Sequence, residues 1–285
     1  MAHSPTVTTC QSDSETLHWR TMTIDDLAAA HGLSRKLGWP HRLEDWKQMF
    51  TVGKGVALDN AKGELIGTGF CLNQGLIATL GLVIIRDDWQ GRGLGRAIMT
   101  RLMAQAGERT LMLVATAAGA PLYYKLGFEP CNTIYQYQGV VAGGVPAIDL
   151  PPGLRAMKDT DRSAIMALFP DNPVHAETVR QATAGIIIEH EGALMGVALK
   201  RPFGRGEHIG PILAYSSDQA QVLIQALLIN AEGHFVRLDL VDLDDDSWLV
   251  GAGLVCVDNV MRMRRGARLD EGPLTRFGLI TQAMG

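Results

Sequence analysis

The stretch QGRGLGRAIM at residues 90–99 places three glycines, two arginines and a glutamine within seven positions. An amphipathic run follows it, and the first backbone N–H groups of a helix lack helical partners and carry the positive end of the helix dipole. Glycine has no Cβ and lets an anion approach those groups, while arginine adds charge-assisted hydrogen bonds. The stretch therefore predicts a phosphate-binding loop made of Gln90, Gly91, Arg92, Gly93, Leu94, Gly95 and Arg96.

Two common nucleotide-binding motifs do not fit this loop. A P-loop requires GxxxxGK followed by serine or threonine, and the loop contains no lysine. A dinucleotide-binding fingerprint requires GxGxxG directly after the first strand of a domain, whereas the spacing here is GxGxG and the run lies deep in the chain. The spacing that remains is Q-x-x-G-x-G, formed by Gln90, Gly93 and Gly95.

The elements that position the loop alternate between apolar strands and amphipathic helices. A strongly apolar run over 76–85 precedes the loop, and Gly81 within that run predicts a bulge or a close backbone approach. The expected elements are strands over 17–22, 52–58, 64–72, 76–85 and 110–115, the last strands of the unit over 128–137, and helices over 23–36, 41–50, 94–105 and 118–126. This alternation predicts an α/β protein with a mixed (α+β) sheet that helices cover.

The sequence also repeats itself weakly. RTMTIDDLAAA from residue 20 resembles RAMKDTDRSAIMA from 155, GELIGTG from 63 resembles GALMGVA from 192, GLVII from 81 resembles GPILA from 210, and LYYKLGF from 122 resembles WLVGAGL from 248. Four matches in one order predict two similar α/β domains in tandem, joined by a stretch rich in glycine and proline. We expect a disordered tail over 1–14, a first domain over 15–140, a linker over 141–153 and a second domain over 154–285.

Composition excludes several classes of protein. The net charge of -4 gives no basic surplus for nucleic-acid binding, and 47% apolar residues suffice for a packed core. The four cysteines are widely spaced, which is typical of reduced cytosolic thiols rather than of disulfides or a zinc site. The chain shows no signal peptide and no apolar stretch of the ~20 residues that a membrane span requires. We expect a cytoplasmic protein that binds no metal, nucleic acid or membrane; its oligomeric state stays open.

Two segments together resemble a known family. LVIIRDDWQGRGLGRAIMTRLM, residues 82–103, resembles the pyrophosphate-binding motif of the GNAT superfamily of acyl-CoA-dependent N-acyltransferases. APLYYKLGFEP, residues 120–130, resembles the later tyrosine–leucine–glycine–phenylalanine segment of that family. The segments LGWPHRLEDW and FGLITQAMG resemble a subgroup in which a second, diverged GNAT-like domain follows the first. The resemblance therefore agrees with the internal repeat.

The resemblance implies the positions of the site residues. Acetyl-CoA would lie between splayed parallel strands over 76–85 and 110–115, with backbone groups of Val83, Ile84 and Ile85 on the pantetheine arm and the 90–96 loop on the pyrophosphate. Relatives often carry an asparagine beside the cofactor where this chain has Ala117, so Thr116 would be the polar substitute. Tyr123 stands at the position of the usual general acid, and Tyr124 is an adjacent hydroxyl.

The group that removes the proton of the amine is not assigned by the resemblance. An alkylammonium with a pKa near 10.4 is almost fully protonated at pH 7, so a base or a desolvating pocket is required. Many family members place a glutamate on the strand that here reads GLIATLGLVII, which contains no acid. His41 is a candidate base, and a capping histidine or a water chain are the alternatives. Cys71 and Cys131 are expected to pack in the core rather than to carry an acyl group.

The second copy has lost the motif residues. AYSSDQAQVLIQALL replaces the glycine loop, with Val222 and Ile224 expected where Gly93 and Gly95 stand, and Leu249 aligns with Tyr123. This copy is expected to be degenerate and to shape the acceptor site or the packing of the two domains. The acidic segment 239–248 is interpreted as a solvated, helix-capping loop, with an attractor for a cationic amine as the alternative.

The leading hypothesis is an acetyl-CoA-dependent N-acetyltransferase that moves the acetyl group directly, in a ternary complex, to a primary amine of a small molecule. The alternatives are an acetyltransferase of protein lysines or N-termini and a non-catalytic acyl-CoA sensor. Tyr123 argues against the sensor, and the unassigned base argues for it. The acceptor and the acyl-chain preference stay open.

Overall fold

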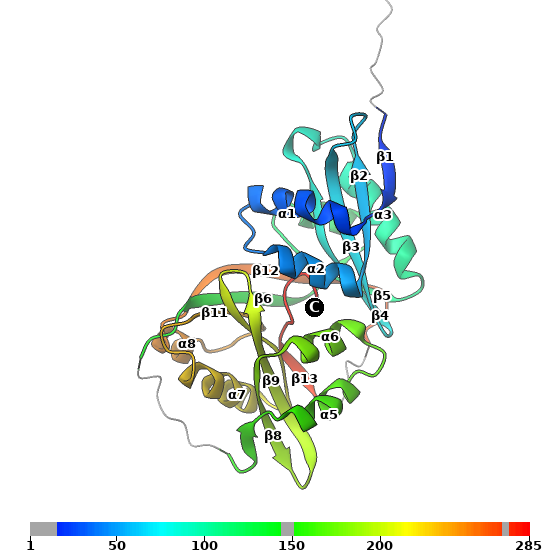
Figure 1. Ribbon diagram of the computed structural model, residues 1–285. Coiled ribbons are helices and arrows are strands. Elements are labelled where there is room, and N and C mark those ends of the chain that lie inside the picture. Colours follow the sequence, from blue (N-terminus) through cyan, green and yellow to red (C-terminus); the bar gives the residue numbers. More distant parts are fainter. Residues whose placement is uncertain (1–15, 144–150, 270–273) are drawn as a thin grey trace, which may run out of the picture.

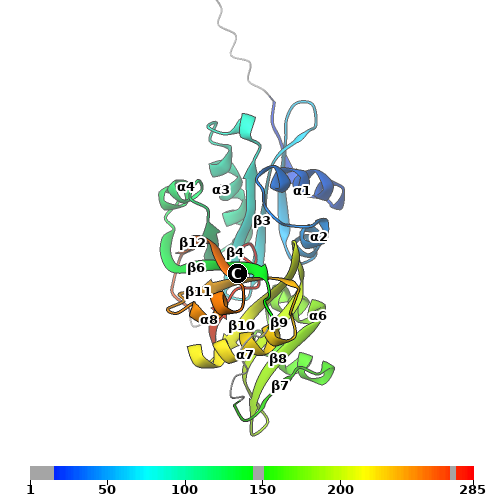
Figure 2. The same ribbon diagram turned by 90° about the vertical axis from the view of Figure 1, so that its left-hand side faces the viewer.

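A computed structural model of the 285-residue chain describes residues 16–143, 151–269 and 274–285. The tail predicted over 1–14 and the centre of the linker predicted over 141–153 lie outside the described residues. Figure 1 shows two lobes of similar build, stacked end to end, with the last residues of the chain between them. The same arrangement is visible from the side in Figure 2.

The described part of the first half contains six strands and four α-helices. In chain order the elements are β1 (His18–Thr21), η1 (Ile24–Asp26), α1 (Leu27–Lys36), α2 (Leu43–Val52), β2 (Lys54–Asp59), β3 (Leu65–Gln74), β4 (Ile77–Ile85), η2 (Asp87–Trp89), α3 (Leu94–Ala106), β5 (Thr110–Ala115), α4 (Ala120–Lys125) and β6 (Glu129–Val140). Strands β4 and β5 are almost wholly apolar because α1 and α2 pack on one face of the sheet and α3 on the other.

The second half repeats this order. Its elements are β7 (Leu154–Ala156), η3 (Asp159–Asp161), α5 (Arg162–Ala167), α6 (Pro173–Gln181), β8 (Ala184–His190), β9 (Ala193–Phe203), β10 (Gly206–Ala214), α7 (Ser217–Ile229), β11 (Phe235–Val241), α8 (Ser247–Gly251), β12 (Val255–Arg265) and β13 (Thr275–Gly278). The mixed sheet with helices confirms the predicted fold class. Strand β13 has no counterpart among the described elements of the first half.

An ion-pair cluster shows the repeat at the level of side chains. Arg20 on β1 lies 2.6 Å from Asp26 and 2.6 Å from Asp59 at the end of β2. Arg155 on β7 lies 2.7 Å from Asp161 and 2.6 Å from Glu189, near the end of β8. Each arginine therefore joins the first strand of its half to the following turn and to the second strand.

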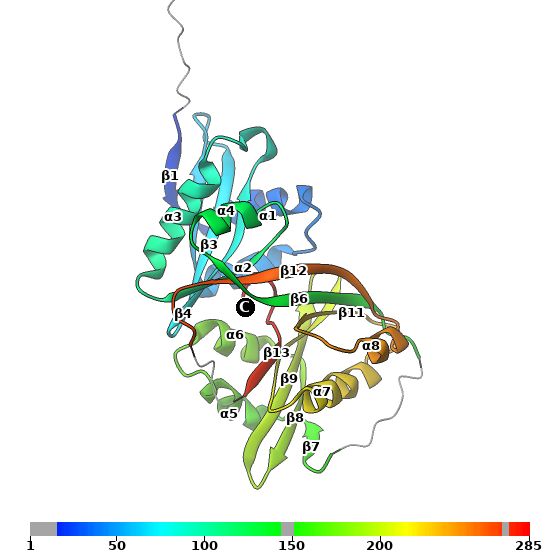
Figure 3. The same ribbon diagram turned by 180° about the vertical axis from the view of Figure 1, so that it is seen from behind.

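The two halves exchange their last strands. The described residues form one 13-stranded sheet in the order β1-β2-β3-β4-β5-β12-β6-β11-β13-β10-β9-β8-β7. Strand β12 of the second half lies between β5 and β6 of the first, and β6 in turn lies between β12 and β11. Figure 3 shows β6 and β12 side by side across the middle of the molecule.

This exchange corrects one expectation. The sequence suggested that the first unit ends with several strands of its own over 128–137, but the structure has the single strand β6 there, and its neighbours come from the second half. The pairing joins residues more than 100 positions apart, such as Met261 with Thr133, so no local pattern could have shown it.

Strand β13 fills a gap in the second half. Strands β10 and β11 pair in parallel only at Glu207 and His208 of β10, and then separate. Strand β13 enters the gap and pairs antiparallel with Ile212, Leu213 and Ala214 of β10. By the repeat that aligns GPILA with GLVII, these three residues correspond to Val83, Ile84 and Ile85 of β4.

Candidate active site

The edge of β4 that faces β5 is open where the cofactor strand contacts were predicted. The two strands pair in parallel at Ile77, Ala78 and Thr79 of β4 and then separate. Beyond Thr79, that edge of β4 makes no strand pairing within the described ranges. The backbone groups of residues 83–85 therefore lie on an edge that a ligand can extend, at the positions that β13 covers in the second half.

A bulge shapes this edge of β4. The register with β3 shifts so that Leu82 and Val83 lie opposite the single residue Gly69. Leu82 has a φ of 50°, which side-chain-bearing residues rarely adopt, and the Thr68 hydroxyl donates a hydrogen bond to its carbonyl at 2.9 Å. Such strain is concentrated at functional sites. The bulge or close approach predicted at Gly81 is confirmed, because a Cβ there would lie 2.5 Å from the Ala283 carbonyl oxygen.

The predicted phosphate loop lies at the start of α3 and faces open space. Gly91 and Gly93 both have a φ of 76°, and a Cβ on either would meet no heavy atom within 4 Å. Helix α3 begins at Leu94 without a side-chain cap at Gly93. The N–H groups of its first turn therefore point into an accessible space that suits an anion.

Side chains of the loop hold it in place. The Gln90 amide donates to the Ile85 carbonyl at 3.1 Å and to Asp87 at 3.0 Å, which ties the loop to the end of β4. The Arg92 guanidinium stacks over Trp89, 4.5 Å from the ring centroid. Arg96 is exposed on the first turn of α3. The structure thus brings the seven predicted loop residues together, and the Gln90 side chain stabilises the loop backbone through its hydrogen bonds.

Thr116 and Tyr123 follow β5. The Thr116 hydroxyl oxygen accepts a hydrogen bond from Gly119 N at 3.2 Å and so stabilises the turn before α4. The Tyr123 ring is 9% exposed and packs edge-on against Phe128. Burial raises the pKa of Tyr123 to about 12, so its hydroxyl is protonated at neutral pH and available as a donor. Tyr124 is exposed, and its hydroxyl lies 3.2 Å from Met261 Sδ on β12.

A pocket of about 300 Å³ lies at the mouth of the gap between β4 and β5. The first half contributes residues 38–41 and 80–82 together with Val114, Thr116 and Gln136, and the second half contributes Phe203, Arg237, Val257, Asp258, Val260 and residues 281–283. Both halves therefore build this pocket. It adjoins the open edge of β4, so a molecule in it would lie beside a ligand bound along that edge.

His41 lines this pocket as a neutral side chain. Its ring packs edge-on against Phe203 with 5.4 Å between the centroids. Its Nδ1 is buried and has no hydrogen-bond partner in the described part of the chain. Burial, followed by the positive charge of Arg237, lowers the pKa of His41 to about 4. The candidate base therefore lies in the pocket, but as a weak base.

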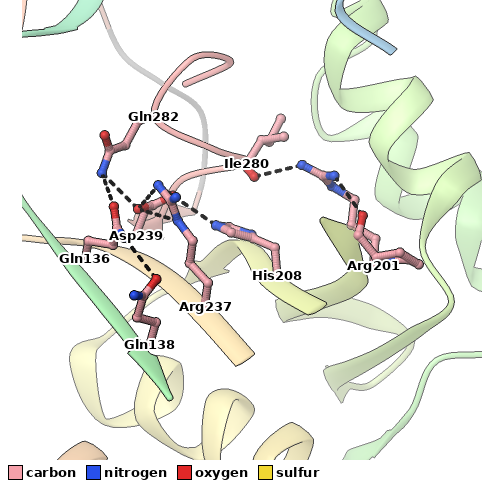
Figure 4. Close-up of polar contacts among 9 residues, drawn as sticks. Gln136, Gln138, Arg201, His208, Arg237, Asp239, Ile280 and Gln282 are labelled. Atoms are coloured by element: carbon pink, nitrogen blue, oxygen red, sulfur yellow. Dashed lines mark hydrogen bonds and ion pairs between the residues drawn. The ribbon is translucent and has the colours of Figure 1, made fainter. Parts of the chain in front are cut away.

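A buried polar network supports the floor of the pocket (Figure 4). Asp239 on β11 is fully buried and accepts hydrogen bonds from Arg237 at 2.8 Å, from His208 Nε2 at 3.0 Å and from the Gln282 amide at 3.1 Å. Although burial opposes the charge, Arg237 and His208 hold the pKa of Asp239 far below its usual range, so it is ionised. Burial keeps His208 neutral by lowering its pKa.

The second half lacks the open loop at the equivalent helix. Helix α7 begins at Ser217, and the Ser216 side chain caps it by accepting a hydrogen bond from Gln219 N. The residues that match Gly93 and Gly95 at the helix start are therefore Ser216 and Asp218. The predicted match with Val222 and Ile224 is wrong by six residues, because those residues lie inside the helix and not at its start. A capped mouth and an acidic first turn both disfavour a phosphate.

The acidic segment 239–248 divides into several structural contacts. Asp239 belongs to the buried network, Asp242 accepts a hydrogen bond from Thr133 N, Asp245 accepts one from Ser247 N, and Asp246 accepts one from the Tyr137 hydroxyl. These four carboxylates therefore stabilise the fold, and the pocket has its acid, Asp258, on β12 instead. The Cys71 thiol, whose pKa burial raises to about 11, is unsuited to nucleophilic work.

Comparison with known families is decisive. Two models, each described as an acetyltransferase (GNAT) domain, match residues 48–130 and residues 174–277. The chain belongs to the GNAT acetyltransferase family. It contains two GNAT domains in tandem and is an acyltransferase, as the sequence resemblance indicated. GNAT enzymes in general use acetyl-CoA.

Several similar proteins match nearly the whole length of the chain. The chain is 27% identical over 283 residues to the uncharacterized N-acetyltransferase YitH of Bacillus subtilis, covering 92% of this GNAT chain and 99% of YitH. A putative acetyltransferase from Pyrococcus horikoshii superposes with a TM-score of 0.71 at 19% identity over 100% of both chains. A tandem GNAT protein from the clavulanic acid biosynthesis pathway superposes with a TM-score of 0.61 at 15% identity, covering 90% of this chain and 99% of the other. These structures share the GNAT fold.

The described residues of the GNAT chain contain neither a metal-binding cluster nor a membrane-spanning helix. In 16–143, 151–269 and 274–285 there is no group of three or more His, Cys, Asp or Glu side chains that could hold a metal ion. In the same ranges no helix is long and apolar enough to cross a membrane.

Sequence reasoning missed the pocket residues that the second half supplies. Phe203, Arg237 and Asp258 lie in segments that carry no motif, and only the fold brings them to the gap between β4 and β5. The resemblance of FGLITQAMG to a subgroup was the one signal that could have pointed to Gln282. That resemblance assigned no function to any single residue of the segment.

Proposed function

We propose that this GNAT protein is a cytoplasmic acetyl-CoA-dependent N-acetyltransferase whose acceptor is a primary amine of a small molecule. The observation that carries the proposal is the open edge of β4 next to an open glycine loop. The second half offers an internal comparison, because β13 covers the same edge there and a serine caps the equivalent helix.

The residues present fit acetyl-CoA. An extended chain with amide groups can pair with the β4 edge at Val83 and Ile85, as β13 does with β10. A diphosphate fits the N–H groups at the start of α3, where the two glycines with positive φ leave the space clear. When bound, acetyl-CoA supplies the acetyl group as an activated thioester.

The chain's own groups would act as positioners and proton carriers. Backbone N–H groups on the β4 edge would donate to the thioester carbonyl oxygen, and one such donor contributes about 3 kcal/mol. In the transfer, the neutral amine nitrogen bonds to the acetyl carbon and loses one further proton to water, the carbon–sulfur bond breaks, and Tyr123 gives its proton to the departing sulfur. With a pKa of about 12 the hydroxyl holds its proton at neutral pH, and because it is a weaker acid than a thiol, the proton transfer is uphill and is completed when solvent reprotonates the tyrosine.

The pocket would supply the amine in its neutral form mainly by desolvation. His41, with a pKa of about 4, is too weak to drive deprotonation of an alkylammonium with a pKa near 10.4. The buried surroundings that lower the pKa of His41 would also lower that of a bound ammonium, since burial disfavours any charged form. The amine proton would then leave to water before the transfer.

The size of the pocket favours a small acceptor over a protein. A volume of about 300 Å³ with walls from both halves is at the lower end of ligand pockets and admits one compact molecule. A protein acceptor would require a longer open groove for the residues that flank the reacting amine.

The test is binding followed by turnover. Isothermal titration calorimetry with acetyl-CoA should show one site per chain in the wild type and a loss of affinity of at least tenfold in Gly93→Val. Gly63→Val is the matched control, because Gly63 has the same kind of positive φ and open surroundings in a distant hairpin. A free-thiol release assay over a panel of amines then tests transfer. Unchanged affinity in Gly93→Val would refute the proposed cofactor site.

A further inference from the structure

The side-chain amide of Gln282 is a constrained polar group in the pocket. Its Nε2 donates to Asp239 Oδ1 and to Gln136 Oε1, each at 3.1 Å. Asp239 is ionised and can only accept, so the NH₂ group of Gln282 must face it. Gln136 is oriented in the same way, because its own Nε2 donates to Gln138 Oε1 at 3.1 Å.

This network fixes the direction of the Gln282 carbonyl. With both N–H bonds committed on one side, Gln282 Oε1 points away from Asp239 and Gln136, as Figure 4 shows. No hydrogen bond from another described side chain or backbone group to this oxygen is found, while Gln282 lines the pocket. The pocket therefore presents a hydrogen-bond acceptor whose orientation is determined before any ligand binds.

The segment that carries Gln282 is held from both sides. Arg201 is 1% exposed, and its guanidinium donates to the Ile280 carbonyl at 3.1 Å. The Gln74 amide donates to the Met284 carbonyl at 2.8 Å. Rigid support of this kind reduces the entropy that a binding group loses when it engages a ligand.

Aromatic rings form part of the pocket lining. Trp39 and His41 lie 5.9 Å apart, and His41 and Phe203 lie 5.4 Å apart, measured between centroids. The rings themselves are uncharged, since His41 is neutral. The Phe203 ring also lies beside two guanidinium groups, those of Arg201 and Arg237, at 5.4 and 5.5 Å from its centroid. Leu80, Leu82 and Val114 continue the apolar surface toward the gap between the strands. Such a wall suits the flat or apolar body of a ligand rather than a chain of hydroxyl groups.

The charges around the pocket admit one cationic group and disfavour several. Asp258 is the acid of the pocket lining, while Arg237 adds a positive charge that Asp239 balances. A polyamine would leave its second and third ammonium groups beside apolar rings and a guanidinium, without a partner. A single ammonium, by contrast, can pair with the exposed Asp258 as it enters and, once it has lost its proton, can donate an N–H to the Gln282 carbonyl.

We propose that Gln282 is the specificity-determining residue for the acceptor, and that its Oε1 receives an N–H of a primary amine carried on a compact apolar, preferably aromatic, body that packs against Trp39, His41 and Phe203. The inference rests on the proposed function, since it assigns the acceptor of the same site. It adds a residue of the second domain to the binding of the substrate.

The experiment measures cofactor binding before amine binding, so that failure of the proposed function can be told apart from failure of the inference. Calorimetry with acetyl-CoA comes first, because failure to bind it would overturn the proposed function itself. Protein saturated with CoA is then titrated with 2-phenylethylamine, putrescine, glucosamine and a hexapeptide with a free N-terminus. We expect 2-phenylethylamine to bind at least tenfold more tightly than the other three.

The variant Gln282→Met removes the carbonyl and keeps the side-chain length. It should weaken the binding of 2-phenylethylamine, and raise its KM, about tenfold, as expected for one hydrogen bond to a charged or polarised group, while the Kd and KM for acetyl-CoA stay within twofold. Gln225→Met is the control, because Gln225 is a buried glutamine on α7 outside the pocket. Thermal unfolding of both variants shows whether the fold is retained.

Three results would overturn the inference and leave the cofactor site intact. The first is equal amine affinity in Gln282→Met and Gln225→Met, and the second is a preference for putrescine, glucosamine or the peptide. The third is the absence of binding by any of the four amines to a protein that binds acetyl-CoA.

Discussion

Replacement of Asp239 by asparagine should destabilise the protein severely. The carboxylate is 0% exposed and accepts hydrogen bonds from Arg237 at 2.8 and 3.0 Å, from His208 at 3.0 Å and from Gln282 at 3.1 Å. All of these groups are donors. Asparagine would direct its own NH₂ group at one of them and leave the Arg237 charge, itself only 6% exposed, without a counter-ion.

The magnitude follows from the cost of leaving a buried charge unpaired. Removing one partner of a buried ion pair costs about 3–5 kcal/mol. For a chain of this size, each kcal/mol corresponds to about 2–4 °C of Tm, so Asp239→Asn should lower Tm by about 6–20 °C. The measurement is urea and thermal unfolding followed by circular dichroism at pH 7.

The pH dependence and a double variant test the reasoning further. The pKa of Asp239 is lowered by folding, so its contribution is present above the unfolded value near 3.9 and is lost only as pH falls below it. The deficit of Asp239→Asn should therefore be constant from pH 5 to pH 8. The double variant Arg237→Met/Asp239→Leu, which removes both charges, should recover part of the loss. A loss below about 1 kcal/mol in the single variant, or a double variant that is less stable still, would refute this account.

Three other predictions concern single residues. Tyr123→Phe should lower kcat at least tenfold with little change in the Kd of acetyl-CoA, whereas Tyr124→Phe should leave both values unchanged. Stopped-flow kinetics measures kcat, and calorimetry measures the Kd. A loss of acetyl-CoA affinity without a fall in kcat would contradict the role of Tyr123 as the acid. His175 is 1% exposed, and burial lowers its pKa to about 4, so protonation of His175 opposes folding increasingly as pH falls from about 6.5 to 4. His175→Phe should therefore reduce the loss of stability that urea unfolding measures in this pH range. An unchanged slope of stability against pH would exclude His175 as the source of the loss. Gly81→Ala should raise the KM for the amine, because the new Cβ would meet the Ala283 carbonyl and displace the segment that carries Gln282. Gly32→Ala, at an open position in a helix, is the control and should leave this KM unchanged. Equal KM values in the two variants would show that the segment is not required for amine binding.

Local patterns predicted the elements of the first half well. The strand over 110–115 agrees with β5, the helix over 94–105 ends one residue before α3 does, and Gly81 lies at the predicted close approach. These features depend on periodicity, on glycine conformation and on apolar runs, all of which are determined by residues close together in the sequence. The glycine loop was recognisable for the same reason.

The parts that failed depend on distant residues. The insertion of β12 between β5 and β6 joins segments from the two halves, and periodicity says which face of a strand is buried but not which strand is its neighbour. The pocket needs Phe203 and Gln282 beside Leu82, a combination that only the exchanged sheet creates. The alignment of Val222 and Ile224 with the glycines was avoidable, because Ser216 and Ser217 at the start of α7 are a recognisable start signal for a helix.

The interleaving of β6 and β12 has a consequence for synthesis on the ribosome. Residue 265, the end of β12, is made 125 residues after residue 140, the end of β6. At translation rates of about 5–20 residues per second, a nascent chain waits roughly 6–25 s with β5 and β6 lacking the strand that belongs between them. Open strand edges attract other chains, so the amino-terminal portion cannot mature as a finished unit and is exposed to association during that interval. The two portions can therefore complete their shared sheet only once β12 has been made, and a premature stop anywhere before β12 should yield insoluble product.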